Sequence, residues 1–405
     1  MREVVRVTDP RLAALLARQA TQYVDRDQLG LDRILALLDR LGRPQDRLPP
    51  VFHVAGTNGK GSTCAFLRAG MEAAGHRVHL FTSPHLVRYN ERIRLSGTMI
   101  SDGQLADVMT RALDADDDIG ASLFELNTAA ALLAFAQTPA DACILEVGLG
   151  GRMDATNVVD RPAVCGIASL GLDHEAFLGS SLAEVAAEKA GIAKRDVPLV
   201  ALAPPAEALA VIERVAGDLG APLLLEGRDW LPDPALRPSL PGAHQLRNAN
   251  LAWAMLSAQS AISVPREAFD RGLAAADWPA RFQRLADGPL TGGVETWLDG
   301  AHNPDAASAL GALLAERPMH LVLGILANKD AAGIIAPLAA HALSLSFTAV
   351  PDHPSHDPEA LAAAFGGRSA GDLQAALAPL PAPRLIAGSL YLAGEALRAN
   401  LQHPD

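Results

Sequence analysis

A glycine-rich stretch near residue 60 contains the residue types that bind phosphate. The apolar run 51–55 leads into Gly56-Thr57-Asn58-Gly59-Lys60-Gly61-Ser62, and residues 64–74 are helix-forming. Glycines let the backbone curl so that N–H groups face a polyanion, and a helix N-terminus adds partial positive charge. A lysine can neutralise the outer phosphates, and a hydroxyl close behind it can reach magnesium. The sequence therefore predicts a strand, a phosphate-binding loop and a helix.

The spacing of this stretch differs from the usual P-loop. Two residues, not four, separate Gly56 from Gly59, and Gly61 rather than a hydroxyl residue follows Lys60. The alternative is an ordinary glycine-rich turn between a strand and a helix. Gly-Lys-Gly-Ser at a helix start after an apolar strand favours nucleotide binding over that alternative.

Glu146 lies where a magnesium ligand is expected. It ends the predicted strand 141–147 and precedes the glycine-rich turn 148–151. A carboxylate at the carboxyl end of a central strand, beside a phosphate loop, is the usual position of a Walker B ligand. The alternative is a carboxylate that caps the next turn; the neighbouring phosphate loop favours the metal role.

Length and composition restrict the class of protein. The 405 residues suffice for two domains, and the net charge of −12 argues against a nucleic-acid partner. Three well-separated cysteines without a C-x-x-C spacing indicate reduced thiols. The first residues carry charges and no long apolar run, so we expect no signal peptide, no membrane partner and a cytoplasmic location.

Alternating strand and helix signals predict an α/β fold. We expect a P-loop-type, mostly parallel sheet over 1–286, a linker at 287–293 where glycine and proline gather, and a smaller Rossmann-like α/β domain over 294–405. The polar, non-periodic segment 82–93 is expected to be a long functional loop.

Nine short motifs together resemble the bacterial dihydrofolate synthase/folylpolyglutamate synthase family of the Mur ligase superfamily. Each motif alone is weak, but their order along nearly the whole chain is specific. They are Gly-Thr-Asn-Gly-Lys-Gly-Ser (56–62), Ser-Pro-His-Leu (83–86), Asn-Glu-Arg-Ile (90–93), Glu-Val-Gly-Leu-Gly-Gly-Arg-Met-Asp-Ala-Thr-Asn (146–157), Leu-Asp-His (172–174), Glu-Lys-Ala-Gly-Ile (188–192), Arg-Phe-Gln (281–283), Asp-Gly-Ala-His-Asn-Pro (299–304) and Gly-Ser-Leu-Tyr-Leu (388–392).

The resemblance implies an ATP site between the domains. The implied ATP contacts are Thr57, Asn58, Gly59, Lys60, Asn248, Arg281 and Asp299. Two magnesium ions are implied, with Ser83, Glu146 and His174 as ligands. Lys189 is implied to be a carbamate formed with CO₂, a ligand for the second ion, although by pattern alone it would be a helix lysine reaching water.

The resemblance also implies a pterin site and residues near the reacting groups. The implied pterin contacts are Gln28, Leu29, Gly30, Ser122, Leu123, Phe124, Glu125, Met153, Asp154 and Ala155. Lys60 is implied to be catalytic, and His302 and Ser389 are expected near the meeting point of glutamate and the activated carboxylate. The implied partners are dihydropteroate, folates and L-glutamate, and we expect a monomer.

The implied reaction is ATP-driven amide formation through an acyl phosphate. It would join L-glutamate to dihydropteroate and to the γ-carboxyl of folyl-glutamates. Segment 29–33 resembles the dihydropteroate-binding segment and favours both activities over a monofunctional folylpolyglutamate synthase. A Mur peptidoglycan ligase needs a separate domain before the loop, for which 50 residues leave no room, and a switching P-loop NTPase would need neither pterin nor amino acid. Two histidines, His353 and His356, are expected in a solvated loop rather than a metal site.

Overall fold

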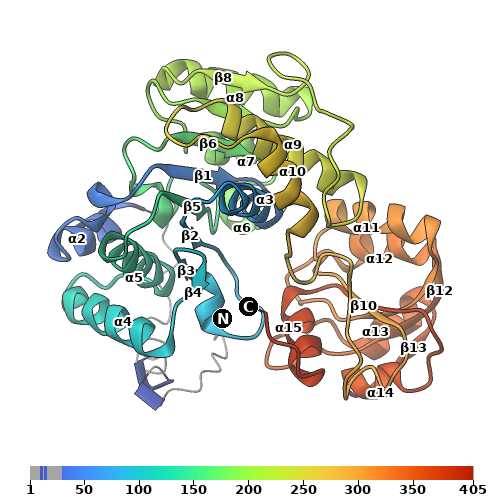
Figure 1. Ribbon diagram of the computed structural model, residues 1–405. Helices are drawn as coiled ribbons and strands as arrows, with labels where there is room; N and C mark the ends of the chain where they lie inside the picture. The colour runs from blue at the N-terminus through green and yellow to red at the C-terminus, as the bar shows by residue number, and fades with distance from the viewer. Residues whose placement is uncertain (1–9, 12, 16–29, 405) are drawn as a thin grey trace.

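The computed structural model describes residues 10–11, 13–15 and 30–404. It contains two sheets, each flanked by helices, which lie side by side in Figure 1 with the C-terminal part in orange and red. This arrangement confirms the predicted α/β class and the mostly parallel first sheet.

The first sheet has eight strands in the order β4-β3-β2-β5-β1-β6-β7-β8. Strands β2, β5, β1, β6, β7 and β8 pair in parallel, whereas β3 and β4 pair antiparallel at one edge. The strands are β1 (Val51–Ala55), β2 (Val78–Phe81), β3 (Ile93–Leu95), β4 (Thr98–Met99), β5 (Ala142–Glu146), β6 (Val164–Ile167), β7 (Leu199–Ala201) and β8 (Leu223–Leu225).

Helices cover both faces of this sheet, which is why all five residues of the central strand β1 are buried. Phe52 and Val54 pack among residues of α3, α9 and α10, whereas Val51 packs among residues of α2, α4 and α5 on the opposite face. Helices α7 and α8 cover the β6–β8 end. The helices are α2 (Asp32–Arg40), α3 (Lys60–Ala73), α4 (Asp102–Asp116), α5 (Leu123–Gln137), α6 (Glu175–Leu178), α7 (Leu182–Ala190), α8 (Ala206–Leu219), α9 (Ala243–Ser257) and α10 (Arg266–Ala275).

The second sheet has six strands in the order β13-β12-β11-β14-β10-β9, with β9 antiparallel to β10. Its strands are β9 (Gln283–Arg284), β10 (Thr296–Leu298), β11 (Met319–Leu323), β12 (Ala342–Phe347), β13 (Arg368–Ser369) and β14 (Arg384–Ala387). Helices α11–α13 contribute to the core on one face, and α14 and α15 to the core on the other. The helices are α11 (Pro304–Glu316), α12 (Ala331–Ala339), α13 (Pro358–Phe365), α14 (Leu373–Leu377) and α15 (Leu390–Ala399).

Strand β9 shows where the chain passes from the first sheet to the second, and this bears on the position of the expected linker. Strand β9 precedes 287–293 in the chain, yet Gln283 and Arg284 pair with Leu298 and Trp297 of the second sheet. The division into 1–286, 287–293 and 294–405 stays a prediction, and this pairing favours a boundary before Gln283.

The expected loop 82–93 contains regular structure that the sequence pattern missed. Residues 89–92 form a short 3₁₀ helix (Tyr89–Arg92), and Ile93 already belongs to β3. Both carboxylate oxygens of Glu91 accept hydrogen bonds from backbone N–H groups, those of Leu86, Val87 and Arg88, at 2.5–2.9 Å. The segment is therefore organised around one half-buried carboxylate that accepts bonds from the backbone three to five positions earlier, a local contact without periodicity in the sequence.

Candidate active site

A cavity of about 270 Å³ lies at the carboxyl ends of β1, β5 and β6 and extends to the loop after β10. Its lining brings together every residue expected to contact ATP or metal, from segments far apart in the sequence. These are Thr57, Asn58, Gly59, Lys60, Ser83, Glu146, His174, Lys189, Asn248, Arg281 and Asp299. His302 lines the same cavity. Ligands bind at this edge of open parallel sheets, because the turns after neighbouring strands meet there.

The phosphate loop is anchored to the neighbouring strand. The N–H groups of Thr57 and Asn58 both donate to the carbonyl of Ser169, at 2.8 and 3.2 Å, so they do not point at the cavity as the curled-loop argument expects. Gly59 has a φ of +89°, and a Cβ there would lie 2.3 Å from Asn248 Oδ1. The loop thus needs glycine at this position for its backbone angle and for its contact with α9.

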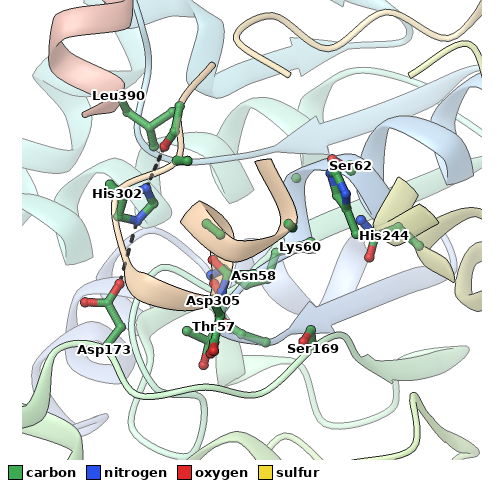
Figure 2. A pocket seen from close by; sticks show the side chains of 18 of the residues that line it. Thr57, Asn58, Lys60, Ser62, Ser169, Asp173, His244, His302, Asp305 and Leu390 are labelled. Carbon is green, nitrogen blue, oxygen red and sulfur yellow. Dashed lines mark hydrogen bonds and ion pairs between the residues drawn. The ribbon is translucent and has the colours of Figure 1, made fainter. Parts of the chain in front are cut away.

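The first turn of α3 offers the donors that the loop does not. Its leading N–H groups have no acceptor within their own helix, and the helix dipole adds positive charge there. Ser62 lines the cavity, and its buried hydroxyl has no hydrogen-bond partner among the described residues. Figure 2 shows Lys60 and Ser62 on this side of the pocket. This end of α3 is suited to bind an anion.

Glu146 and Ser83 are held together at the cavity wall. Glu146 Oε2 accepts hydrogen bonds from the Thr82 hydroxyl and, at 3.3 Å, from the Ser83 N–H. Burial raises the pKa of Glu146, against the opposing effect of Lys60. His174, the third expected ligand, is exposed and has a left-handed backbone with φ of +54°.

These donors are oxygen and imidazole groups, the ligand types that a partly hydrated magnesium accepts. Within the part of the chain that the structure describes, no group of three or more His, Cys, Asp or Glu side chains forms a closed metal site. Glu146, His174 and the Ser83 hydroxyl would supply three ligands and leave the other coordination positions to water or phosphate oxygens. These residues therefore fit a partly hydrated magnesium ion.

Lys189 is buried in the cavity wall rather than reaching water. Only 4% of the residue is exposed, and its Nζ donates to the carbonyl of Gly56 at 3.0 Å. Burial, together with the positive charge of Lys60, lowers the pKa of Lys189 to about 7. A substantial fraction of this amine is therefore neutral near pH 7.

Arg281 and Asp299 bring opposite charges from the second sheet. Asp299 accepts from the N–H groups of Phe282 (2.7 Å) and Ala301 (2.8 Å), and Arg281 donates to the Ala280 carbonyl at 2.9 Å. Burial lowers the pKa of Arg281 and raises that of Asp299, while each partner opposes the shift of the other. The Arg281 guanidinium therefore faces the first sheet as a positive group held by backbone contacts.

His302 is half-buried beside Asp173. Its Nδ1 lies 2.8 Å from the Gly300 carbonyl, and its Nε2 lies 3.6 Å from Asp173 Oδ2 (Figure 2). Burial, then the charge of Lys329, lowers the pKa of His302 to about 4. The ring is neutral at pH 7, and a bond to a carbonyl makes Nδ1 the protonated nitrogen.

Ser389, expected beside His302, does not line the cavity. It is buried, and its hydroxyl accepts from the Tyr391 N–H at 3.1 Å as the N-cap of α15; the next residue, Leu390, reaches the cavity instead. In the structure Ser389 caps the start of α15. Its catalytic role stays a prediction.

The expected pterin residues adjoin the cavity without lining it. Ser122 and Glu125 form a reciprocal cap at the start of α5, with Leu123 and Phe124 half-buried between them. A Cβ on Gly148, a cavity residue, would lie 2.3 Å from Phe124 Cζ, so this group lies directly behind the glycine-rich turn. Glu125 also accepts from Arg33 at 3.1 Å.

Other members of the pterin set are placed differently. Asp154 is buried; its carboxylate accepts from the Leu149 N–H at 2.9 Å and from the Thr156 hydroxyl at 2.5 Å. Met153 is half-buried and Ala155 is buried, while Gly30 is half-buried just before α2. Gln28 and Leu29 lie outside the described residues. The pterin role of the whole set stays a prediction.

Several cavity residues were not predicted. His244, Gln245, Asp173 and Asp305 all line it. Asp173 belongs to the Leu-Asp-His motif at 172–174, and His244 and Gln245 precede Asn248 by about one helical turn. Their positions beside expected site residues could have pointed to the cavity. Burial lowers the pKa of His244 to about 4, so its ring is neutral at pH 7.

None of the helices in the described part of the chain is both long and apolar enough to cross a bilayer.

Comparisons with known proteins bear on the family and the fold of the chain. The family model for the Mur ligase glutamate ligase domain matches residues 280–383. The chain is similar to the dihydrofolate synthase/folylpolyglutamate synthase of Bacillus subtilis, with 37% identity over 71% of this chain and 72% of that protein.

Solved structures are similar over almost the whole chain. Escherichia coli FolC in complex with DHPP and ADP is 33% identical, with a TM-score of 0.86 over 96% of this chain and 97% of that one. The bifunctional folylpolyglutamate synthase/dihydrofolate synthase of Yersinia pestis, complexed with AMPPNP and a Mn ion, is 32% identical, with a TM-score of 0.86 over 98% and 99%.

Proposed function

Because this chain belongs to the dihydrofolate synthase/folylpolyglutamate synthase family of Mur ligases, we propose that it joins L-glutamate to dihydropteroate and to folyl-glutamates with ATP. The observation that carries this proposal is the shared cavity, in which Lys60 and Glu146 of one sheet face Arg281 of the other. The bifunctional names of the B. subtilis and Y. pestis relatives favour both activities over polyglutamylation alone.

In the proposed reaction, a carboxylate oxygen of the pteroyl or folyl substrate attacks the γ-phosphorus of ATP. The bond to the β–γ bridging oxygen breaks, ADP leaves, and an acyl phosphate remains. The amine nitrogen of L-glutamate then attacks the acyl carbon, phosphate leaves, and the ammonium protons pass to solvent or to a base. Lys60, Arg281 and the first turn of α3 would stabilise the charge that spreads over the transferred phosphoryl group.

A divalent ion bound by Ser83, Glu146 and His174 would supply Lewis-acid polarisation of the phosphoryl oxygens. Support comes from the chemistry of this donor set, from the unpartnered Ser62 hydroxyl beside it, and from the Mn ion in the Y. pestis relative. Magnesium as the working metal, and the presence of two ions, are part of the proposal.

We propose that Lys189 carries a carbamate. The ammonium first loses one proton; the neutral amine then adds to CO₂, forms an N–C bond and releases a second proton, so that a buried cation becomes an anion. The support is the lowered pKa of about 7 and the cavity position beside Lys60. An anionic Lys189 would remove the repulsion between the two lysines and provide oxygen ligands for a second ion.

His302 is better suited to orienting the amine than to removing its proton. With a pKa of about 4, its neutral Nε2 can accept a hydrogen bond from an amine but is a weak proton acceptor. The acyl phosphate must also be shielded from water, and a cavity with walls from two sheets provides that enclosure.

The experiment that tests this function compares acceptors and resolves products by glutamate number. Purified protein with ATP, Mg²⁺ and L-glutamate should convert dihydropteroate to dihydrofolate and extend tetrahydrofolate by at least one glutamate. Extension of tetrahydrofolate alone would make the protein a monofunctional folylpolyglutamate synthase. No glutamylated product from either acceptor would refute the proposal.

A further inference from the structure

An ion pair connects the two sheets at the rim of the cavity. Asp173 lies in the turn after β6 of the first sheet, and Lys329 lies in the turn after β11 of the second. Lys329 Nζ contacts Asp173 Oδ1, and the two side chains are only 10% and 9% exposed. Pairs this well shielded from water interact more strongly than the exposed ion pairs elsewhere on the surface.

The second carboxylate oxygen of Asp173, Oδ2, lies near two further side chains, Asn303 and His302, which follow a strand of the second sheet. Asn303 Nδ2 donates to Asp173 Oδ2 at 3.2 Å, and His302 Nε2 lies 3.6 Å from the same atom. One carboxylate of the first sheet therefore bonds two side chains that follow strands of the second, Lys329 and Asn303, and the neutral ring of His302 lies nearby.

Asn303 continues this contact to the phosphate loop. Its Nδ2 donates to Asn58 Oδ1 at 2.9 Å, and Asn58 Nδ2 donates to Asn303 Oδ1 at 3.1 Å. The same Oδ1 accepts from the Ala306 N–H at 2.9 Å as the N-cap of α11. The start of α11 is thus fixed against the phosphate loop on one side and against Asp173 on the other.

Lys329 is itself held in place by the segment whose histidines had no assigned role. His356 Nε2 lies 2.9 Å from the Lys329 carbonyl, and the His356 N–H donates to the Ile325 carbonyl at 2.9 Å. His353 packs against Tyr391, with ring centroids 3.9 Å apart and the rings tilted by 40°. The two histidines of the expected solvated loop are half-buried, whereas Asp352 and Pro354 are exposed, and His356 braces the turn that carries Lys329.

We infer that Asp173 and Lys329 form an interdomain clasp, a pair of positioning residues that holds His302 and Asn303 in register with the phosphate loop. The clasp needs no contact with the reacting atoms: it sets the distance between the part of the site that binds ATP and the part where the amine would arrive. Small misplacements of such groups lower rates by as much as about 100-fold. The expected change in kcat rests on the proposed function, whereas the expected change in the radius of gyration does not.

The test uses four variants of the full-length protein: Asp173→Asn, Lys329→Gln, their combination, and Lys329→Arg. Arg266→Gln is the control, because it removes an ion pair with Asp233 at 2.6 Å on the first sheet's side only. The measurements are kcat and KM for L-glutamate, the Kd of a non-hydrolysable ATP analogue, and the radius of gyration by small-angle X-ray scattering with that analogue bound.

The clasp predicts that each single neutral variant lowers kcat on the order of 10- to 100-fold, with nucleotide Kd within about twofold of the parent. The combined variant should be no slower than the slower single one, because both remove the same contact. Lys329→Arg should recover most of kcat, and Arg266→Gln should match the parent. The radius of gyration should increase in the neutral variants and stay unchanged in Lys329→Arg.

Three results would overturn the clasp. These are multiplicative losses in the combined variant, an unchanged radius of gyration in both single variants, or a Lys329→Arg protein as slow as Lys329→Gln. The combined variant leaves no unpaired buried charge, so it keeps the test valid if a single variant fails to fold. Absence of ligase activity in the parent protein would refute the proposed function, while the scattering comparison would still decide the clasp.

Discussion

Lys60 and Lys189 donate hydrogen bonds to the same acceptor, the carbonyl oxygen of Gly56, at 2.9 and 3.0 Å. Two ammonium groups therefore lie side by side at the base of the cavity, one from the phosphate loop and one from α7. Their mutual repulsion contributes to the lowered pKa of Lys189. A triphosphate bound beside the two lysines, a carbamate on Lys189, or both would relieve this repulsion.

The carbamate proposal predicts a pH-dependent CO₂ adduct on Lys189. Only the neutral amine adds CO₂, so with a pKa of about 7 the adduct should increase as pH rises through 7 and decrease below it. With ¹³C-bicarbonate, a carbamate carbon signal should appear at pH 8 and be lost in Lys189→Arg. Lys194→Arg is the control, since Lys194 is also a partly buried lysine with a lowered pKa. A signal that persists in Lys189→Arg would contradict the assignment.

Replacing Lys60 by alanine should abolish ATP turnover. The substitution removes the cation at the start of α3 that would face the phosphates, and such losses lower kcat by at least about 100-fold. Arg68→Ala, two turns further along α3, removes a cation outside the cavity lining and should leave turnover unchanged. Steady-state ADP release measures both. Near-normal turnover in Lys60→Ala would exclude its phosphate role.

Gly59→Ala and Gly75→Ala separate backbone strain from crowding. Both glycines have φ near +90°, so each substitution should destabilise the fold by about 1–2 kcal/mol. A Cβ at position 59 would lie 2.3 Å from Asn248 Oδ1, whereas one at position 75 meets nothing within 4 Å. Thermal unfolding should therefore shift further in Gly59→Ala, which adds this close contact to the shared backbone strain, and only Gly59→Ala should weaken binding of an ATP analogue. Equal nucleotide affinities would show that the contact with Asn248 is unimportant.

Glu146→Gln should weaken divalent metal binding by at least about tenfold. The amide keeps the size of the side chain but removes the negative charge at the cavity wall. Glu72→Gln is the control, because Glu72 is a partly buried carboxylate with a raised pKa that does not line the cavity. Mn²⁺ titration by electron paramagnetic resonance, with an ATP analogue present, measures both. Unchanged affinity in Glu146→Gln would remove Glu146 from the metal site.

The parts of the fold that depend on local pattern were predictable from sequence. The strand before Gly56 and the helix after Gly59 follow from an apolar run, glycines and helix-forming residues within 25 positions. The edge strands β3 and β4 were missed because three and two residues are too few to show an alternating pattern.

In the candidate site, too, the residues within motifs were predictable from sequence, whereas the contacts between distant segments were not. Motif residues such as Lys60 and Glu146 lie in the cavity as expected. The pairing of Asp173 with Lys329, 156 positions apart, depends on how the two sheets meet, and no spacing within either segment encodes it. Burial of Lys189 is also a tertiary property, because a lysine among alanines on a helix is as compatible with a surface position.

The most direct test of the account is whether ADP release requires both co-substrates. With ATP and Mg²⁺ present, the parent protein should release ADP slowly alone, and much faster when dihydropteroate and L-glutamate are both added. Each amide formed should be matched by one ADP. ADP release that is fast without them, or that neither co-substrate stimulates, would contradict the ligase function and indicate an NTPase of another kind.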